Sequence, residues 1–222
     1  KKAVVGPLSD EATAVCRERA EQLAVDLHTF QEDFGLEQDR FWNERAELVL
    51  PPLGLKGDYQ RENAAVALEA FFLYMEGLEE AVDMNLVKLA LQETCWPGRL
   101  ELFGEQLYLD GAHNPHAMAR LIEFANSLAG KRVKVLFGAL KRKDYSGMLE
   151  ALQAGLPEAE LILTTFHYGE VVAQGDRQDL PYVADYKAYI QEFMDQSRSD
   201  EVLFVTGSLY FIAEVRAFLL EA

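Results

Sequence analysis

The second half of this 222-residue sequence predicts an α/β fold built on a mostly parallel sheet. Three short segments there, at residues 133–137, 161–165 and 202–205, are mostly apolar and do not alternate strictly with polar residues; they read VKVLF, LILTT and VLFV. Each of them is followed by a segment with helical periodicity. Strands that are apolar on both faces and lead into helices are typical of a parallel sheet covered on both sides. We therefore expect a Rossmann-like α/β domain in this half.

The first half predicts a different set of elements. A strand at residues 3–5 ends at Gly6-Pro7, and Ser9 is expected to cap a helix that runs to about Val25. Residues 27–50 suggest short strands with polar turns at about 31–39. From Asp58 the apolar residues follow a helical period, and they fall on one stripe: Ala64, Ala67, Leu68, Phe71, Phe72 and Met75. Asp83 is expected to cap a second helix, whose inward-facing residues would be Leu86, Leu89 and Ala90.

Trp96-Pro97-Gly98 is the clearest break in the chain, because proline and glycine together end a helix. We place the domain boundary there, with one domain at residues 1–95 and the other at 96–222. After the break we expect a hairpin of residues 100–103 and 107–109. Helices are then expected to alternate with the three apolar strands, at residues 115–129, 144–156, 182–196 and 208–220.

The charge balance excludes some kinds of partner. Lys and Arg number 21 against 37 Asp and Glu, which gives a net charge of −16. So acidic a surface repels nucleic acid and anionic lipid, so we predict no nucleic-acid or membrane partner. No apolar run approaches the roughly 20 residues that cross a bilayer. Two cysteines, Cys16 and Cys95, have no metal-ligand spacing, which favours a reducing, cytoplasmic location.

The strongest candidate site is the segment Leu109-Asp110-Gly111-Ala112-His113-Asn114-Pro115, which follows a predicted strand. Ligands of open parallel sheets bind at the carboxyl ends of the strands. A carboxylate there can accept hydrogen bonds from two ribose hydroxyls, and His113 can lie against a nucleotide. Asn114 and Pro115 have the residue types that cap and begin a helix. The alternative is that Asp110 is a turn residue and His113 packs over the start of the helix.

Two further polar residues are candidates for nucleotide contacts. Arg99 follows Pro97-Gly98, and its guanidinium could bind a phosphate with two parallel hydrogen bonds. An ion pair with one of the many acids explains Arg99 equally well. Asn63 carries the donor and the acceptor that an adenine edge needs, although a half-exposed asparagine on a helix is the simpler interpretation.

Two segments are candidates for binding an anion. Thr206-Gly207-Ser208 joins a buried strand to a helix, and its N–H groups and hydroxyls suit a carboxylate or a phosphate. Ser208 could also serve only as the N-cap of that helix. Lys141-Arg142-Lys143 is the only dense basic cluster, and the alternative for it is a solvated loop.

Several kinds of chemistry lack their sequence signatures. His113 and His116 are three residues apart, but no third ligand accompanies them, so we predict no metal site in this chain. The sequence has no Gly-x-x-x-x-Gly-Lys-Ser/Thr loop for a triphosphate and no Gly-x-Ser-x-Gly elbow. Nothing in these residues could activate a phosphoryl group unaided.

Four motifs in register resemble folylpolyglutamate synthase and the bifunctional dihydrofolate synthase, relatives of the Mur ligases. They span residues 54–65, 96–101, 109–115 and 206–210 and read GLKGDYQRENAA, WPGRLE, LDGAHNP and TGSLY. The resemblance runs from about residue 1 to the end. It implies that residues 1–95 are the last part of an α/β ATPase domain without its phosphate-binding loop, and that residues 96–222 are the Mur-ligase-type C-terminal domain.

The same resemblance implies an ATP-dependent amide ligase that adds L-glutamate to folate or dihydropteroate. It implies that Asn63 contacts adenine, that Arg99 contacts the phosphates and Asp110 the ribose, and that His113 lies beside the nucleotide in a catalytic position. Lys143, also catalytic, and Ser208 would then act on the glutamate side. Expected cofactors are ATP and Mg²⁺, with the metal ligands upstream of these residues, and the full-length enzyme is expected to be a monomer.

One departure from the family pattern concerns the basic cluster. Arg142 stands where the family more often has aspartate, before Lys143-Asp144. The resemblance also implies that the family's phosphate-binding loop and magnesium ligands lie upstream of these residues, so the chain alone is expected to be inactive. Two alternatives stay open: a nucleotide-binding regulatory α/β module without ligase chemistry, and the C-terminal region of a cell-wall Mur ligase.

Overall fold

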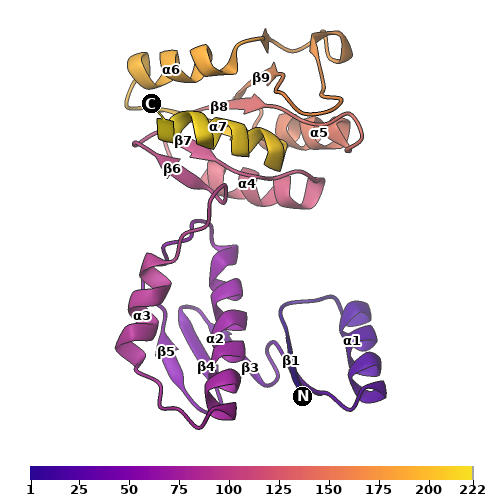
Figure 1. Ribbon diagram of the computed structural model, residues 1–222, viewed down its shortest axis with the longest axis vertical. Coiled ribbons are helices and arrows are strands. Elements are labelled where there is room, and N and C mark those ends of the chain that lie inside the picture. Colours follow the sequence, from indigo (N-terminus) through magenta and orange to yellow (C-terminus); the bar gives the residue numbers. More distant parts are fainter. Residues whose placement is uncertain (222) are drawn as a thin grey trace. The chain divides into compact units, whose positions relative to one another are not determined.

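The computed structural model describes residues 1–221, which divide into two units, Lys1–Thr94 and the residues from Cys95 onward (Figure 1). The first unit contains two small sheets and three helices. Its elements in chain order are β1 (Lys2–Val5), α1 (Asp10–Gln22), β2 (Asp26–Thr29), β3 (Phe34–Glu37), β4 (Arg40–Asn43), β5 (Glu47–Val49), α2 (Tyr59–Gly77) and α3 (Met84–Glu93).

Strands β1 and β2 pair in parallel, and β3, β4 and β5 form an antiparallel sheet. Ser9 caps α1 as expected, because its hydroxyl accepts a hydrogen bond from the N–H of Ala12 at 3.3 Å. The turn expected at about 31–39 is wrong in part, since β3 lies within it. The reason is Phe34, which is fully buried and belongs to the core that the antiparallel sheet forms with α2.

Helix α2 buries a narrower stripe than the sequence suggested. Ala64, Leu68 and Phe72, spaced four residues apart, are buried, whereas Ala67 and Phe71 are exposed. Helix α3 begins at its predicted cap, where the Asp83 carboxylate accepts the N–H of Asn85 at 2.8 Å.

The face predicted for α3 is wrong. The three residues expected to face inward are all exposed: Leu86, Leu89 and Ala90. The core instead contacts the neighbouring row of Met84, Val87 and Leu91, which has the same helical spacing.

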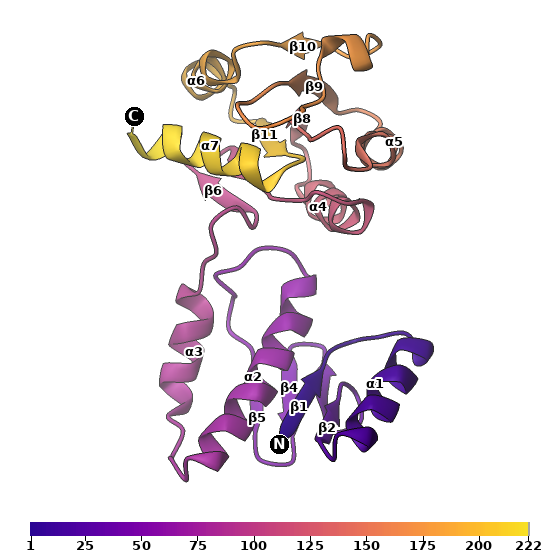
Figure 2. The ribbon, with the colours of Figure 1, turned by 45° about the vertical axis from the view of Figure 1, so that its right-hand side comes forward.

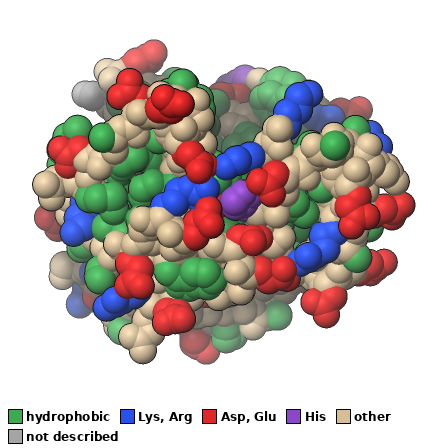
Figure 3. Space-filling view, turned by 90° about the horizontal axis from the view of Figure 1, so that it is seen from below, with side chains coloured by type: hydrophobic (Ala, Val, Ile, Leu, Met, Phe, Trp, Pro, Cys, Tyr) green, Lys and Arg blue, Asp and Glu red, His purple; other side chains and the backbone are tan. Residues whose placement is uncertain are grey.

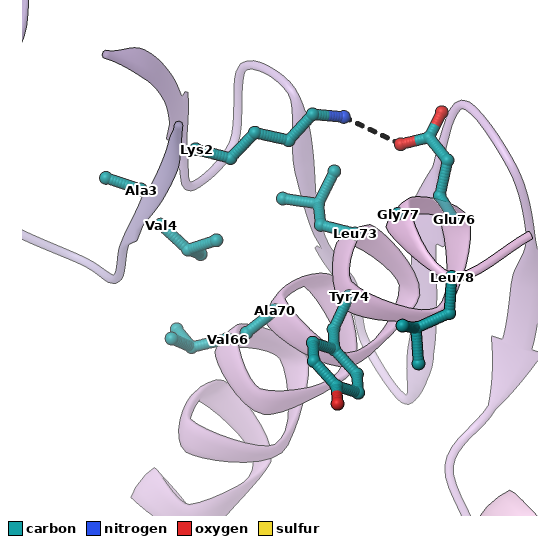
Figure 4. Close-up of a pocket in the computed structure, with 10 residues that line it drawn as sticks. All are labelled: Lys2, Ala3, Val4, Val66, Ala70, Leu73, Tyr74, Glu76, Gly77 and Leu78. Carbon is teal, nitrogen blue, oxygen red and sulfur yellow. Dashed lines mark hydrogen bonds and ion pairs between the residues drawn. The ribbon is translucent and has the colours of Figure 1, made fainter.

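Two apolar hollows remain at the surface of the first unit. One, of about 750 Å³, lies between β1 and α2 and is lined by side chains such as Val4, Val66 and Leu73 (Figure 4). An ion pair of Lys2 and Glu76, with 2.6 Å between Nζ and Oε2, lies at its edge. The other hollow, of about 440 Å³, lies between α2 and α3.

A carboxylate is buried inside the first unit. Glu69 of α2 has no exposed surface, and its Oε2 accepts a hydrogen bond from Nδ2 of Asn43 at 2.7 Å. Its Oε1 lies 2.8 Å from Nδ1 of His28 on β2. These contacts join α2 to both small sheets, a role that no sequence pattern indicated.

The second unit is a six-stranded sheet with helices on both faces (Figures 1 and 2). Its elements in chain order are β6 (Glu101–Phe103), β7 (Leu107–Leu109), α4 (Pro115–Ser127), β8 (Arg132–Phe137), α5 (Tyr145–Gly155), β9 (Glu160–Thr164), a short 3₁₀ helix (Gln174–Asp176), β10 (Tyr182–Val183), α6 (Tyr186–Gln196), β11 (Glu201–Thr206) and α7 (Leu209–Glu221).

The strand order is β10-β9-β8-β11-β7-β6, and every neighbouring pair is parallel except the β6–β7 hairpin. The predicted α/β class, the mostly parallel sheet and the hairpin are therefore confirmed. Helices α4 and α5 pack on one face, and α6 and α7 pack on the other (Figure 2). All six residues of β11 are buried, including the four apolar residues of the predicted strand at 202–205.

One helix boundary was wrong. The helix expected from residue 182 begins only at Tyr186, because residues 182–183 form β10 beside β9. Asp185 caps the helix by accepting the N–H groups of Lys187 and Ala188 at 3.1 and 3.0 Å. An N-cap residue has an extended backbone, so the helix cannot start before it.

Acidic side chains are spread over the face shown in Figure 3, with basic side chains between them. Such a mixed surface fits a chain with 37 acidic and 21 basic residues. Within residues 1–221, no helix combines the length and the apolar character that crossing a bilayer requires.

Candidate functional site

Four loops of the second unit meet at the carboxyl ends of β7, β8 and β11. They comprise residues 96–100, 110–115, 138–144 and 206–208. The N–H of Gly207 donates to the carbonyl of Ala112 at 3.1 Å, and the N–H of Gly138 donates to the carbonyl of Thr206 at 3.0 Å. The N–H of Gly111 donates to the carbonyl of Gly98 at 2.7 Å. This is the edge at which a parallel sheet binds ligands, so we take these loops as the candidate site.

Asp110 follows β7 and is 5% exposed. Its Oδ2 accepts the N–H of Leu100 at 3.0 Å and its Oδ1 accepts the N–H of Ala112 at 2.9 Å. Burial raises the pKa of this carboxyl, while the two N–H groups and the charges of Arg99 and His113 oppose that rise. The turn interpretation of Asp110 therefore holds. Each oxygen keeps one lone pair, which a ligand hydroxyl could use.

Arg99 lies in the turn that Asp110 holds. Its N–H donates to the carbonyl of Trp96 at 3.1 Å, and its side chain is exposed. The guanidinium makes no ion pair with the described residues of the second unit. The next residue, Leu100, has a φ of +46°, a rare value for leucine, and is held there by its buried side chain and its hydrogen bond to Asp110. The turn therefore presents Arg99 at the site on a fixed backbone.

His113 is half-buried, and its Nδ1 lies 2.8 Å from the carbonyl oxygen of Gly111. A carbonyl only accepts, so Nδ1 carries the proton of this hydrogen bond, and Nε2 is the ring nitrogen left for a ligand. The predicted cap of α4 is present, since Asn114 accepts the N–H of Ala117 at 2.8 Å and Pro115 begins the helix. His113 is thereby fixed between a strand end and a helix start.

Ser208 is buried at the start of α7, and its hydroxyl accepts the N–H of Tyr210 at 3.3 Å. The capping interpretation of Ser208 therefore holds, and the hydroxyl still has a proton to donate. Gly207 before it has a φ of +110°, and a Cβ there would lie 2.7 Å from the carbonyl oxygen of Gly138. Only glycine allows this close approach of the loops after β8 and β11.

The basic cluster lies in the loop after β8. Lys141 is paired with Asp176, with 2.9 Å between Nζ and the carboxylate. Lys143 is exposed, and its N–H donates to the carbonyl of Leu140 at 3.0 Å. No hydrogen bond joins its side chain to His113 or Ser208, so the structure places Lys143 on the same edge without joining it to them.

Asn63 belongs to the first unit. It is exposed on α2, and its Nδ2 donates to Oε1 of Gln60 at 2.8 Å. The other predicted site residues, Arg99, Asp110, His113, Lys143 and Ser208, all belong to the second unit.

Sequence reasoning missed two features of this edge. Glu101 accepts the N–H of Gly98 at 2.8 Å and pairs with Nε of Arg216 at 3.0 Å, which ties the Arg99 turn to α7. Tyr168 and Tyr210 also stack on each other there, with 3.6 Å between ring centroids. Tyr210 is the last residue of the TGSLY motif and could have been proposed as a site residue, but nothing in the sequence near Tyr168 indicates that Tyr210 is its partner.

Metal ligation can be tested directly. Within residues 1–221, no group of three or more His, Cys, Asp or Glu side chains could hold a metal ion.

The fold and the polar loops define a class: an α/β ligand-binding domain whose site lies at the carboxyl edge of a parallel sheet. The sequence profile of the Mur ligase glutamate ligase domain matches residues 98–209, which include nearly all of these loops. The chain therefore belongs to the Mur ligase family.

Curated relatives agree with that membership. The chain is 34% identical to a dihydrofolate synthase/folylpolyglutamate synthase of Bacillus subtilis, over 73% of this chain and 39% of the relative. It is 27% identical to folylpolyglutamate synthase of Lacticaseibacillus casei, over 98% of this chain and 54% of the relative. The chain thus spans about half or less of the length of these relatives.

Solved structures share the fold. A bifunctional folylpolyglutamate synthase/dihydrofolate synthase from Yersinia pestis, complexed with AMPPNP and Mn ion, aligns with a TM-score of 0.82 and 24% identity, over 99% of this chain and 53% of that one. A folylpolyglutamate synthase from Thermotoga maritima aligns with a TM-score of 0.79 and 22% identity, over 98% of this chain and 53% of that one. At these identities the likeness shows the fold.

Proposed function

We propose that this chain forms the glutamate-ligase part of an ATP-dependent enzyme that adds L-glutamate to folate or dihydropteroate. The observation that carries the proposal is the family match over residues 98–209, because it includes nearly all of the loops that meet at the carboxyl edge of the sheet. The names of the curated relatives supply the substrate class.

Amide formation from a carboxylate requires activation, because a carboxylate is a poor electrophile. In the proposed reaction an oxygen of the acceptor carboxylate attacks the γ-phosphorus of ATP, and ADP leaves. The amine of glutamate then attacks the carbonyl carbon of the acyl phosphate. Phosphate leaves with the electrons of the broken C–O bond, and the amine loses a proton. The domain contributes mainly by holding the two reactants in contact.

Three residues are proposed for the nucleotide side of the second unit. Arg99 has a guanidinium free to bind phosphate oxygens on a turn that Asp110 fixes. Asp110 retains lone pairs for a ribose hydroxyl, in addition to its structural hydrogen bonds. His113 presents Nε2 beside them and is the proposed catalytic contact to the nucleotide. Asn63 of the first unit is proposed for the adenine edge.

Ser208 and Lys143 are proposed for the incoming glutamate. The Ser208 hydroxyl can donate to a carboxylate while it accepts the N–H of Tyr210. Lys143 supplies a positive charge from the loop after β8, in the catalytic role of drawing the glutamate toward the acyl phosphate.

Mg²⁺ would neutralise the phosphate charge, but the described residues do not fit it, since residues 1–221 offer no metal-binding cluster. We therefore assign no step of the reaction to a metal held by this chain. The Mg²⁺ ligands, like the activating phosphate loop, are proposed to come from outside it, which makes the chain inactive by itself.

Calorimetric titration of the chain with ATP·Mg²⁺ and with L-glutamate, together with a phosphate-release assay with tetrahydrofolate, tests the proposal. We expect weak binding and no turnover from the chain alone. In the full-length enzyme, Arg99→Ala and Asp110→Ala should each strongly reduce ATP-dependent ligation. Near-normal turnover in both variants would refute the site assignment, and folate-stimulated phosphate release by the chain alone would refute the incomplete site.

A further inference from the structure

An aromatic pair lies next to the proposed glutamate site and takes no part in either core. Tyr168 comes from the loop after β9, and Tyr210 comes from the first turn of α7. Their ring centroids are 3.6 Å apart and the ring planes differ by 13°. The residues are 42% and 43% exposed. Two large rings that stack on each other at the surface keep apolar surface exposed to solvent that no other part of the fold covers.

Both rings are held by hydrogen bonds that fix the backbone around them. The carboxylate of Glu214 accepts the N–H of His167 at 2.9 and 3.3 Å, and it also accepts the hydroxyl of Tyr186 at 3.1 Å. This joins the loop that carries Tyr168 to α7. The N–H of Tyr210 donates to the hydroxyl of Ser208, so the pair is connected directly to a residue that is proposed to bind the incoming L-glutamate.

The backbone also places Arg142 beside Tyr168. Leu140 and Val171 form an antiparallel bridge, the N–H of Lys141 donates to the carbonyl of Glu170 at 2.9 Å, and the N–H of Val172 donates to the carbonyl of Ala139 at 2.8 Å. Continuing this register brings Arg142 to the turn that contains Tyr168. The electrostatics agree, because the positive charge of Arg142 lowers the pKa of Tyr168, against the larger rise caused by its hydrogen bond with Tyr210.

Arg142 lacks a carboxylate partner in the described part of the second unit. Neighbouring cations are paired: Lys141 with Asp176, Arg177 with Asp179 and Arg216 with Glu101. In a chain with a net charge of −16, a guanidinium left without an acid at the ligand-binding edge is available for an anion from outside.

We propose that Arg142 and the Tyr168–Tyr210 pair form a second carboxylate subsite, next to Ser208, that takes a glutamyl carboxylate. The guanidinium would bind the carboxylate through two parallel N–H···O bonds, and a tyrosine hydroxyl can donate a third. The exposed edges of the rings would pack against the methylene groups of the glutamyl chain. The carboxylate comes either from free L-glutamate or from a γ-linked glutamyl tail on the acceptor. This inference rests on the proposed function, in which Ser208, the residue next to the subsite, binds L-glutamate.

Binding by the chain tests the subsite, with two probes that separate the two sources: L-glutamate and a γ-linked triglutamate peptide. The binding constant is measured by calorimetry at low salt, and NMR follows the ring protons of Tyr168 and Tyr210. Arg142→Ala should weaken binding of at least one probe about 10- to 100-fold, the range of a charge-assisted hydrogen bond. Arg142→Lys should restore part of that loss, because lysine keeps the charge without the planar fork.

Arg198→Ala is the matched control, since Arg198 is an exposed arginine just before β11, at the amino ends of the strands. It removes the same charge and should leave binding unchanged. A loss for the triglutamate alone assigns the subsite to the acceptor tail, and a loss for L-glutamate alone assigns it to the incoming amino acid.

The subsite is refuted when Arg142→Ala binds both probes as tightly as the unaltered chain, or when the unaltered chain binds neither probe at its highest soluble concentration. A result in which Ser208→Ala weakens L-glutamate binding and Arg142→Ala has no effect would refute the subsite alone and keep the proposed function. Carboxylate binding that depends on Arg142, in a full-length enzyme that does not consume ATP, would refute the proposed function and keep the subsite.

Discussion

Replacing Asp110 with alanine should destabilise the second unit before it affects any ligand. The carboxylate is the acceptor for two backbone N–H groups, those of Leu100 and Ala112, and both hydrogen bonds are buried. A buried donor left without a partner costs about 1–3 kcal/mol, so Asp110→Ala should lower the free energy of unfolding by about 2–6 kcal/mol. Asp110→Asn keeps one carbonyl oxygen and should lose about half as much.

Urea denaturation followed by circular dichroism measures this loss, and amide hydrogen exchange locates it. The N–H groups of Leu100 and Ala112 should exchange faster in Asp110→Ala. Asp195→Ala on the exposed side of α6 is the control and should change the free energy of unfolding by no more than about 0.5 kcal/mol. An Asp110→Ala chain as stable as the control, with unchanged exchange at both amides, would refute the structural role of this carboxylate.

Three further predictions concern stability. Burial raises the pKa of Asp110 in the folded state, so the contribution of this side chain to stability is fully present below about pH 4 and declines as the pH rises through the raised pKa. Urea titrations across pH should show that the difference in free energy of unfolding between the parent chain and Asp110→Asn shrinks as the pH rises. A constant difference would contradict the direction of the pKa shift. Glu69→Ala leaves the Nδ2–H of Asn43 without its acceptor and removes the buried carboxylate beside His28, and should cost about 1–3 kcal/mol; a double replacement of Glu69 and His28 by leucine should cost less, which a double-mutant cycle would check. Asn114→Ala removes the cap of α4 and should cost about 1 kcal/mol, seen as a lower Tm; an unchanged Tm would argue against the cap.

The alternation of apolar strands and helices was enough to predict the second unit. Residues such as Val202 to Val205 are apolar on both faces because helices cover both sides of the sheet, so their pattern carries the topology. Caps such as Asp83 and Asn114 were predictable for the same reason, since each acts on backbone groups only two or three residues away. Interactions between residues that are close in the chain can therefore be predicted from a single sequence.

Contacts between segments that are far apart in the chain could not be predicted from the sequence. The exposed face of α3 was mistaken for its buried face, because Leu86 and Val87 are equally apolar and only the position of the antiparallel sheet decides between them. Glu69 was not noticed because its partners, His28 and Asn43, lie 41 and 26 residues away. The Tyr168–Tyr210 stack joins a loop to the first turn of α7, 42 residues further along the chain, in the same way.

Asp110 shows why a residue's chemistry does not by itself settle its role at a site. The sequence offered two readings, a ligand for ribose and a turn residue, and the structure shows the second through two buried hydrogen bonds. These bonds also fix the turn that presents Arg99, so loss of Asp110 would displace a proposed phosphate ligand even where Asp110 touches no substrate. The two roles separate in the full-length enzyme. A positioning role predicts that Asp110→Asn, which keeps one of the two acceptors, retains more activity than Asp110→Ala, in proportion to the protection of the Leu100 amide. A direct contact with ribose predicts a weaker affinity for ATP in both variants, whatever the protection of that amide.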